Sequence, residues 1–140
     1  MNIVVLYESL TGNTRRVAEL VGGAARSAGA DVAVRPVSEP DLHELAEADA
    51  IIIGTWTDGL VLFGMRPAAA NRLRALPVIE HKPVGVFCTY AVNPGRTLDK
   101  LAAIVEGRGG KVVAGQAFKR SDLETRVPDF VAEVMVSVTA

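Results

Sequence analysis

The feature that most constrains the fold is a set of four short runs rich in valine and isoleucine. None of them alternates polar with apolar residues over its whole length. They are evenly spaced and cover Ile3–Tyr7, Ala50–Ile53, Val84–Cys88 and Lys111–Phe118. Near-continuous apolar strands occur where both faces of a sheet are covered, as in parallel α/β sheets. A fifth run, Asp31–Val37, does alternate and is typical of a more peripheral strand.

Helical patterns fill the intervals between these strands. Apolar residues recur at helical spacing in segments 17–28, 98–105 and 127–138. A shorter helix is predicted over Pro67–Leu76, and Pro40–Ala46 is long enough for a turn or two. Alternating strands and helices with right-handed crossovers predict an α/β fold with a doubly wound five-stranded parallel sheet and helices on both faces.

Composition limits the classes of function that remain. The 140 residues suffice for one domain, so we expect residues 1–140 to form a single one. With 15 basic and 16 acidic residues, the net charge of −1 gives no drive toward nucleic acid or an anionic membrane. The single cysteine, Cys88, excludes an intrachain disulfide and fits a reducing, cytoplasmic setting. We also expect no signal peptide and no membrane-spanning segment.

The first candidate site follows the first strand. In doubly wound sheets, ligands bind beyond the carboxyl ends of the strands. The segment Ser9–Thr14 places three hydroxyls and one glycine where a helix begins, and helix N-termini favour anions. It lacks the lysine of a nucleoside-triphosphate loop and the glycines of a dinucleotide fingerprint. The pattern predicts a monophosphate site, although a turn that merely caps the helix has the same composition.

Two further loops follow neighbouring strands, and each carries one aromatic residue. The first contains Trp56, which is the only tryptophan, and the second contains Tyr90. An aromatic side chain at a ligand edge can stack on a flat ring, although Trp56 could instead fold back into the core. A phosphate cradle and two aromatics at adjacent strand ends together suit a flat heteroaromatic monophosphate.

These features resemble those of the short-chain flavodoxin family. The segment Ser9-Leu10-Thr11-Gly12-Asn13-Thr14 matches the family's phosphate signature, Ser/Thr-x-Thr-Gly-x-Thr. The resemblance covers essentially the whole chain and implies the strand order 2-1-3-4-5 and FMN as cofactor. It implies that the phosphate is held by Ser9, Leu10, Thr11, Gly12, Asn13 and Thr14. It also implies that two loops clasp the isoalloxazine ring: Thr55, Trp56, Thr57, Asp58 and Gly59, and Thr89, Tyr90, Ala91, Asn93, Pro94 and Gly95.

The same resemblance implies a function. It predicts a monomeric, cytoplasmic carrier that shuttles single electrons from a reductase to an acceptor enzyme, with no catalytic or metal-binding residues of its own. Two alternatives stay open: an FMN-dependent NAD(P)H:quinone-type reductase, and a domain of this fold without a redox role. A phosphoryl-receiver domain fits poorly, because Glu8 has no acidic neighbour with which to bind magnesium. The chain departs from the family in being nearly neutral rather than strongly acidic, with Arg66 and Arg96 close to the ring loops.

Overall fold

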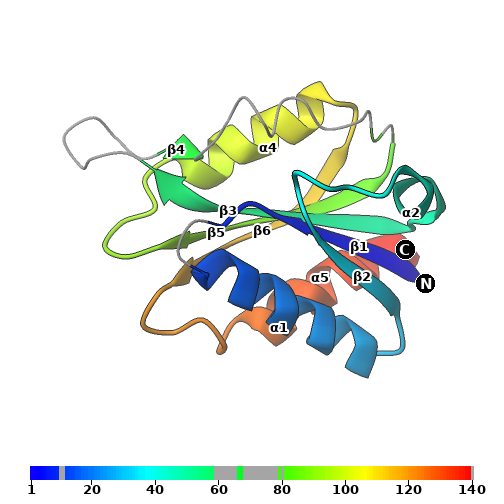
Figure 1. Ribbon diagram of the computed structural model, residues 1–140, viewed down its shortest axis with the longest axis horizontal. Coiled ribbons are helices and arrows are strands. Elements are labelled where there is room, and N and C mark those ends of the chain that lie inside the picture. Colours follow the sequence, from blue (N-terminus) through cyan, green and yellow to red (C-terminus); the bar gives the residue numbers. More distant parts are fainter. Residues whose placement is uncertain (10–11, 59–65, 68–78, 80, 140) are drawn as a thin grey trace.

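The computed structural model describes residues 1–9, 12–58, 66–67, 79 and 81–139 (Figure 1). Strands and helices follow one another along the chain. In order they are β1 (Asn2–Tyr7), α1 (Asn13–Ser27), β2 (Asp31–Pro36), α2 (Leu42–Glu47), β3 (Ala50–Asp58), β4 (Arg66–Pro67), β5 (Pro83–Tyr90), α4 (Thr97–Gly107), β6 (Lys111–Lys119) and α5 (Val127–Thr139).

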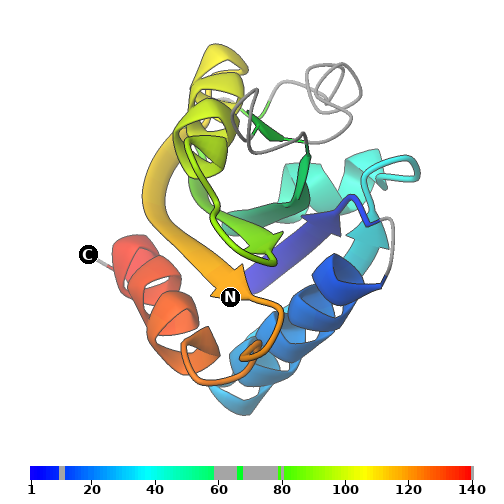
Figure 2. The ribbon, with the colours of Figure 1, turned by 90° about the vertical axis from the view of Figure 1, so that its left-hand side faces the viewer.

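Five strands form a parallel sheet in the order β2-β1-β3-β5-β6. Because β4 lies off this path, the order is 2-1-3-4-5 when the parallel strands alone are counted, which confirms the prediction. The short strand β4 pairs antiparallel with the end of β3, through Thr57 with Pro67 and Asp58 with Arg66. Figure 2 looks onto the edge of the sheet where the parallel strands end.

Helices cover both faces of the sheet, as predicted (Figures 1 and 2). Helices α1 and α5 lie side by side on one face, and α4 and α2 lie on the other. The N-cap of α2 is Asp41, whose carboxylate accepts a hydrogen bond from the Glu44 N–H over 3.1 Å. No helix in the described part of the chain is long and apolar enough to cross a membrane.

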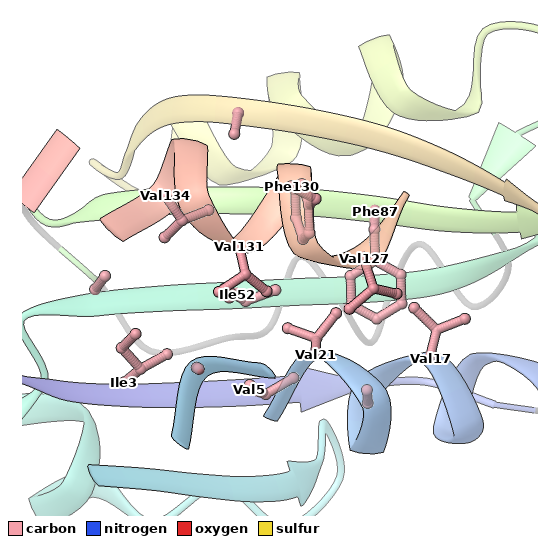
Figure 3. Packing of buried hydrophobic residues seen from close by; sticks show 14 of the residues in the cluster. Ile3, Val5, Val17, Val21, Ile52, Phe87, Val127, Phe130, Val131 and Val134 are labelled. Atoms are coloured by element: carbon pink, nitrogen blue, oxygen red, sulfur yellow. The ribbon is translucent and has the colours of Figure 1, made fainter. Parts of the chain in front are cut away.

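The α1/α5 face holds the larger packed core. Figure 3 shows side chains from α1 and α5 meeting those of β1, β3 and β5. Phe87, Phe118 and Phe130 touch edge to face, with ring centroids 5.9 to 6.2 Å apart. Gly54 on β3 pairs with Phe87 on the neighbouring strand β5. A Cβ at position 54 would stand 2.0 Å from the Phe87 ring. The ring therefore fills the space that a side chain at position 54 would need.

Two adjacent glycines lie inside α1, which continues through both of them. A Cβ on Gly22 would stand 2.8 Å from Cγ2 of Val34 on β2, whereas a Cβ on Gly23 would meet nothing within 4 Å. Two glycines inside a helical pattern are unfavourable and predict either a shorter helix or close packing on the sheet. The structure supports close packing at Gly22. The fold gives no such reason for Gly23.

The predicted helix over Pro67–Leu76 is wrong at its first residue. Pro67 belongs to strand β4, where it pairs with Thr57. A proline fits there because a two-residue edge strand does not require every backbone N–H. The remainder of that predicted helix lies outside the described residues.

Candidate functional site

The loop after β1 leads into α1 through a glycine in the left-handed region. Gly12 has a φ of 97° and is the N-cap of α1, whose first residue is Asn13. Its backbone N–H donates to the Ser9 hydroxyl over 3.1 Å. A side chain would make this φ costly, although a Cβ at Gly12 would meet no described atom within 4 Å. The turn therefore leaves open space beside the helix N-terminus.

The charges around this helix N-terminus favour an anion. The first turn of α1 contains no acidic side chain, and the N-terminus carries the positive end of the helix dipole. Arg15 and Arg16 lie in the first turn of the helix, and each pairs with a glutamate. Arg15 pairs with Glu19 over 3.1 Å and Arg16 with Glu124 over 3.0 Å. Positive charge at this end thus comes chiefly from the backbone, with two exposed arginines nearby.

Thr14 connects this turn to the end of β5. Both Thr14 and Thr89 are buried, and their hydroxyl oxygens lie 2.9 Å apart. The pairing joins residues 75 positions apart in the sequence. Each hydroxyl has one proton to donate and lone pairs to accept with. If Thr89 donates to Thr14, the Thr14 proton is available to a ligand oxygen.

Strand β3 is longer than the sequence predicted. The prediction ended it at Ile53, but pairing with β5 continues as far as Trp56. Thr55, Trp56, Thr57 and Asp58 therefore lie in a strand rather than a loop. Thr55 is buried, while Trp56 is half-buried and belongs to neither core cluster. The described core does not contain the tryptophan, which counts against the alternative in which Trp56 fills it.

A buried hydroxyl lies at the same strand ends. The Oγ1 atom of Thr57 is buried and has no hydrogen-bond partner among the described residues. Cys88 on β5 is a diagonal neighbour of Thr57, because it pairs directly with Thr55. Burial raises the pKa of the Cys88 thiol to about 11, and the nearby Thr57 hydroxyl offsets part of that rise. Cys88 is thus a neutral core side chain at physiological pH.

The second ring loop is also shorter than predicted, because β5 extends to Tyr90. The dipeptide Asn93-Pro94 is typical of a helix start, with a capping residue before a first-position proline, and it predicts a helix from Pro94 that the structure does not have. Helix α4 begins at Thr97, and the Asn93 side chain instead accepts a hydrogen bond from the Gly95 N–H over 2.8 Å. This turn has its own hydrogen bond and a Gly95 φ of 55°, so the helix starts later.

The structure brings the three predicted segments to one edge of the sheet, at the ends of β1, β3 and β5. Tyr90 and Pro94 are half-buried, and Ala91 is exposed. Three predicted site residues lie outside the described residues: Leu10, Thr11 and Gly59. Sequence reasoning passed over Val92, whose side chain is 78% exposed within the second ring loop. An apolar residue between turn residues was the available signal.

The fold and the candidate site define a class of doubly wound α/β proteins. In this chain a glycine-containing helix N-terminus and two aromatic residues lie at the carboxyl edge of the sheet. Comparison with known proteins narrows this class. The Flavodoxin domain family matches residues 4–106. The flavodoxin of Megasphaera elsdenii is 26% identical over 111 residues, which cover 79% of this chain and 81% of that protein. A flavodoxin of Aquifex aeolicus is 38% identical over 66 residues, which cover 46% of this chain and 36% of that protein.

Solved structures show the same fold. Two-electron reduced Megasphaera elsdenii flavodoxin superposes with a TM-score of 0.76 at 21% identity, over 99% of each chain. Oxidised flavodoxin 1 of Bacillus cereus superposes with a TM-score of 0.74 at 23% identity, over 97% of this chain and 98% of that one.

The chain belongs to the flavodoxin family. It is accordingly an FMN-binding electron carrier that works with redox partners.

Proposed function

We propose that the segment Ser9–Thr14 holds the phosphate of FMN. The observation that carries this proposal is the left-handed Gly12 at the N-cap of α1, with open space beside it and no acidic side chain in the first helical turn. A phosphate group fits such a helix N-terminus because backbone N–H groups and hydroxyls stabilise its charge. Ser9 and Thr14 supply hydroxyls at either side of the turn.

The isoalloxazine ring lies between Thr55–Gly59 and Thr89–Gly95. Strands β3 and β5 are neighbours in the sheet, so their carboxyl ends open onto the same space. Trp56 offers a half-buried aromatic face outside the described core, and the Thr57 hydroxyl is a buried polar group beside the Cys88 thiol with no other partner among the described residues. These two groups suit a ring with apolar faces and polar edges.

FMN supplies one-electron chemistry when it is bound. The chain's own residues bind and orient it and keep water from its buried side. We propose that the protein carries electrons from a reductase to an acceptor enzyme as a cytoplasmic monomer, with residues 1–140 as one domain. The balance of 15 basic and 16 acidic residues supports protein partners rather than nucleic acid or a membrane surface.

A comparison of FMN with riboflavin tests the phosphate site. Riboflavin lacks the phosphate but keeps the ring, so the difference in affinity isolates the phosphate contacts. Hydrogen bonds to a charged group contribute about 1.5–3 kcal/mol each. We expect calorimetry on the apoprotein to show that FMN binds at least about tenfold more tightly. Equal affinities for the two flavins would contradict the proposal.

A turnover assay separates the carrier from a reductase. The holoprotein is mixed with reduced nicotinamide and a quinone, first alone and then with an added flavoprotein reductase. A carrier oxidises the nicotinamide only when the reductase is present. Rapid oxidation without it would identify an NAD(P)H:quinone-type reductase instead.

A further inference from the structure

Three basic residues flank the second ring loop at the edge where β5 and β6 end. Tyr90 and Lys119 are paired across these two strands, and the Arg120 N–H donates to the Tyr90 carbonyl over 2.8 Å. Arg96 follows the loop as the N-cap of α4. The loop that begins after Tyr90 is therefore bounded by Lys119 and Arg120 on one side and by Arg96 on the other.

These three side chains are exposed. Arg96, Lys119 and Arg120 form no ion pair within the described part of the chain. The arginines on the first turn of α1 differ, because both are paired with glutamates.

The nearest acidic residues in sequence do not pair with them. The Asp122 carboxylate accepts hydrogen bonds from the Thr125 hydroxyl over 2.8 Å and from the Thr125 N–H over 3.3 Å. Asp99 lies in the first turn of α4, where it complements the helix dipole. Asp122 lies beside Lys119, because the backbones of these two residues pair. The three cations and two acids together leave this edge with one net positive charge, in a chain whose net charge is −1.

An exposed apolar side chain lies in the loop that these cations flank. Val92 is 78% exposed in the loop that Arg96 ends. Protein interfaces combine an apolar centre with a charged rim, and the charges steer the encounter. Val92, Arg96, Lys119 and Arg120 supply one exposed apolar side chain and three cations in or beside a single loop, and we call them the basic edge.

We propose that the basic edge docks an electron-transfer partner protein whose own surface around its redox centre is acidic. The proposal rests on the proposed function, because that function places the flavin ring against the loop that carries Val92. Charge complementarity selects an acidic partner, and proximity to the ring makes the docked complex competent for electron transfer. Such complexes are small and depend on electrostatic steering, which salt weakens.

A peptide probe tests the charge preference without any flavin. Hexaglutamate is titrated into 15N-labelled apoprotein at low salt. Hexalysine, a peptide of the opposite charge, is titrated in the same way as a control. We expect hexaglutamate to shift the amide signals of Val92, Arg96, Lys119 and Arg120, and hexalysine to leave them in place. Lys119→Glu should weaken hexaglutamate binding by about threefold or more. Shifts spread evenly over the protein would overturn the proposal.

Lys111→Glu is the matched control for this titration. Lys111 is exposed at the opposite end of the same strand β6, so its reversal changes the net charge equally but leaves the basic edge intact. We expect this variant to bind hexaglutamate as the parent does. Equal weakening by Lys111→Glu and Lys119→Glu would also overturn the proposal, because net charge alone would then explain it.

A redox probe separates this proposal from the proposed function. Reduced holoprotein is mixed with ferricyanide, which takes one electron to become ferrocyanide, or with hexaammineruthenium(III), which takes one electron to become the ruthenium(II) ion. Relative to Lys111→Glu, Lys119→Glu should slow oxidation by the anion and speed oxidation by the cation. Oxidation rates that are the same for Lys119→Glu and Lys111→Glu would overturn the proposal that the basic edge docks a partner. Loss of electron transfer to both oxidants would contradict the carrier function and leave the peptide titration as the test of the edge.

Discussion

The hydroxyl oxygens of Thr14 and Thr89 lie 2.9 Å apart in the protein interior. One belongs to the first turn of α1 and the other to the end of β5, so this contact joins the proposed phosphate site to the proposed ring site. Two of the predictions below follow from it.

Replacement of Thr14 by valine removes one hydroxyl from the proposed phosphate site. We expect FMN affinity to fall about tenfold or more, since a hydrogen bond to a charged group contributes about 1.5–3 kcal/mol. Riboflavin affinity should change much less. Calorimetry on both flavins gives the comparison, with Ser137→Ala on α5 as a distant hydroxyl control. An equal loss for the two flavins would show that Thr14 does not act through the phosphate.

The same pair governs the stability of the apoprotein. Thr14→Val leaves the Thr89 hydroxyl buried without its partner, and this costs about 1–3 kcal/mol. In the double variant with Thr89→Val neither hydroxyl is left unpaired. Its loss of unfolding free energy should therefore be smaller than the sum of the losses in the two single variants. Urea unfolding of the four proteins measures this coupling. Strictly additive losses would mean that the two hydroxyls do not form a hydrogen bond.

Trp56 provides a spectroscopic test of the ring site, because it is the only tryptophan. We expect FMN to quench its fluorescence strongly on binding, and Trp56→Ala to bind FMN less tightly because an apolar ring face is lost. A fluorescence titration and calorimetry give the two readouts. Full emission from a flavin-saturated protein would place Trp56 away from the ring.

The glycine pair in α1 makes a matched comparison of packing with helix propensity. Gly23→Ala should raise the unfolding free energy by about 1 kcal/mol, because its Cβ meets nothing and alanine favours the helix. Gly22→Ala should lose that gain or destabilise the protein, because its Cβ would press against Val34 at 2.8 Å. Urea unfolding compares the two variants. A similar gain in both would mean that α1 moves away from β2 at little cost.

Cys88 makes stability depend on pH at the alkaline end. Burial raises the pKa of its thiol from 9.0 to about 11, so the folded protein keeps a proton that the unfolded chain releases. Stability should therefore fall as pH rises from about 9 to 11, by roughly 2–3 kcal/mol. Cys88→Ala should lack this part of the decline. Unfolding curves at several pH values for both proteins measure it, and parallel declines would contradict it.

The sheet could be predicted from sequence because burial on both faces leaves a local signal. The runs around Val5, Ile52, Val86 and Val112 are rich in apolar residues. The order of the strands was implied by the resemblance to short-chain flavodoxins, since doubly wound sheets occur in more than one order. The ends of β3 and β5 could not be predicted. Thr55 to Asp58 and Thr89 to Tyr90 are polar or aromatic, and their strand conformation depends on pairing partners far along the chain.

The candidate site was predicted from its position after each strand, but the contacts among its residues could not be predicted. Thr14 and Thr89 were both candidate ligands, yet nothing local indicates that they bond each other across 75 residues. Asn93 is a residue type that often caps a helix, but its side chain instead accepts a hydrogen bond from the Gly95 N–H within its own turn. Local chemistry thus indicates candidate residues, and tertiary structure decides which hydrogen bonds they form.

The Phe87 ring over Gly54 has a consequence for how this sequence can change over time. A side chain at position 54 would overlap the ring, and the ring is held in turn by Phe118 and Phe130. A lineage that gains even an alanine at position 54 must therefore first acquire a smaller residue at position 87. The opposite order passes through a protein with an overfilled core. The two positions are expected to vary together among relatives, with the change at 87 always the older one.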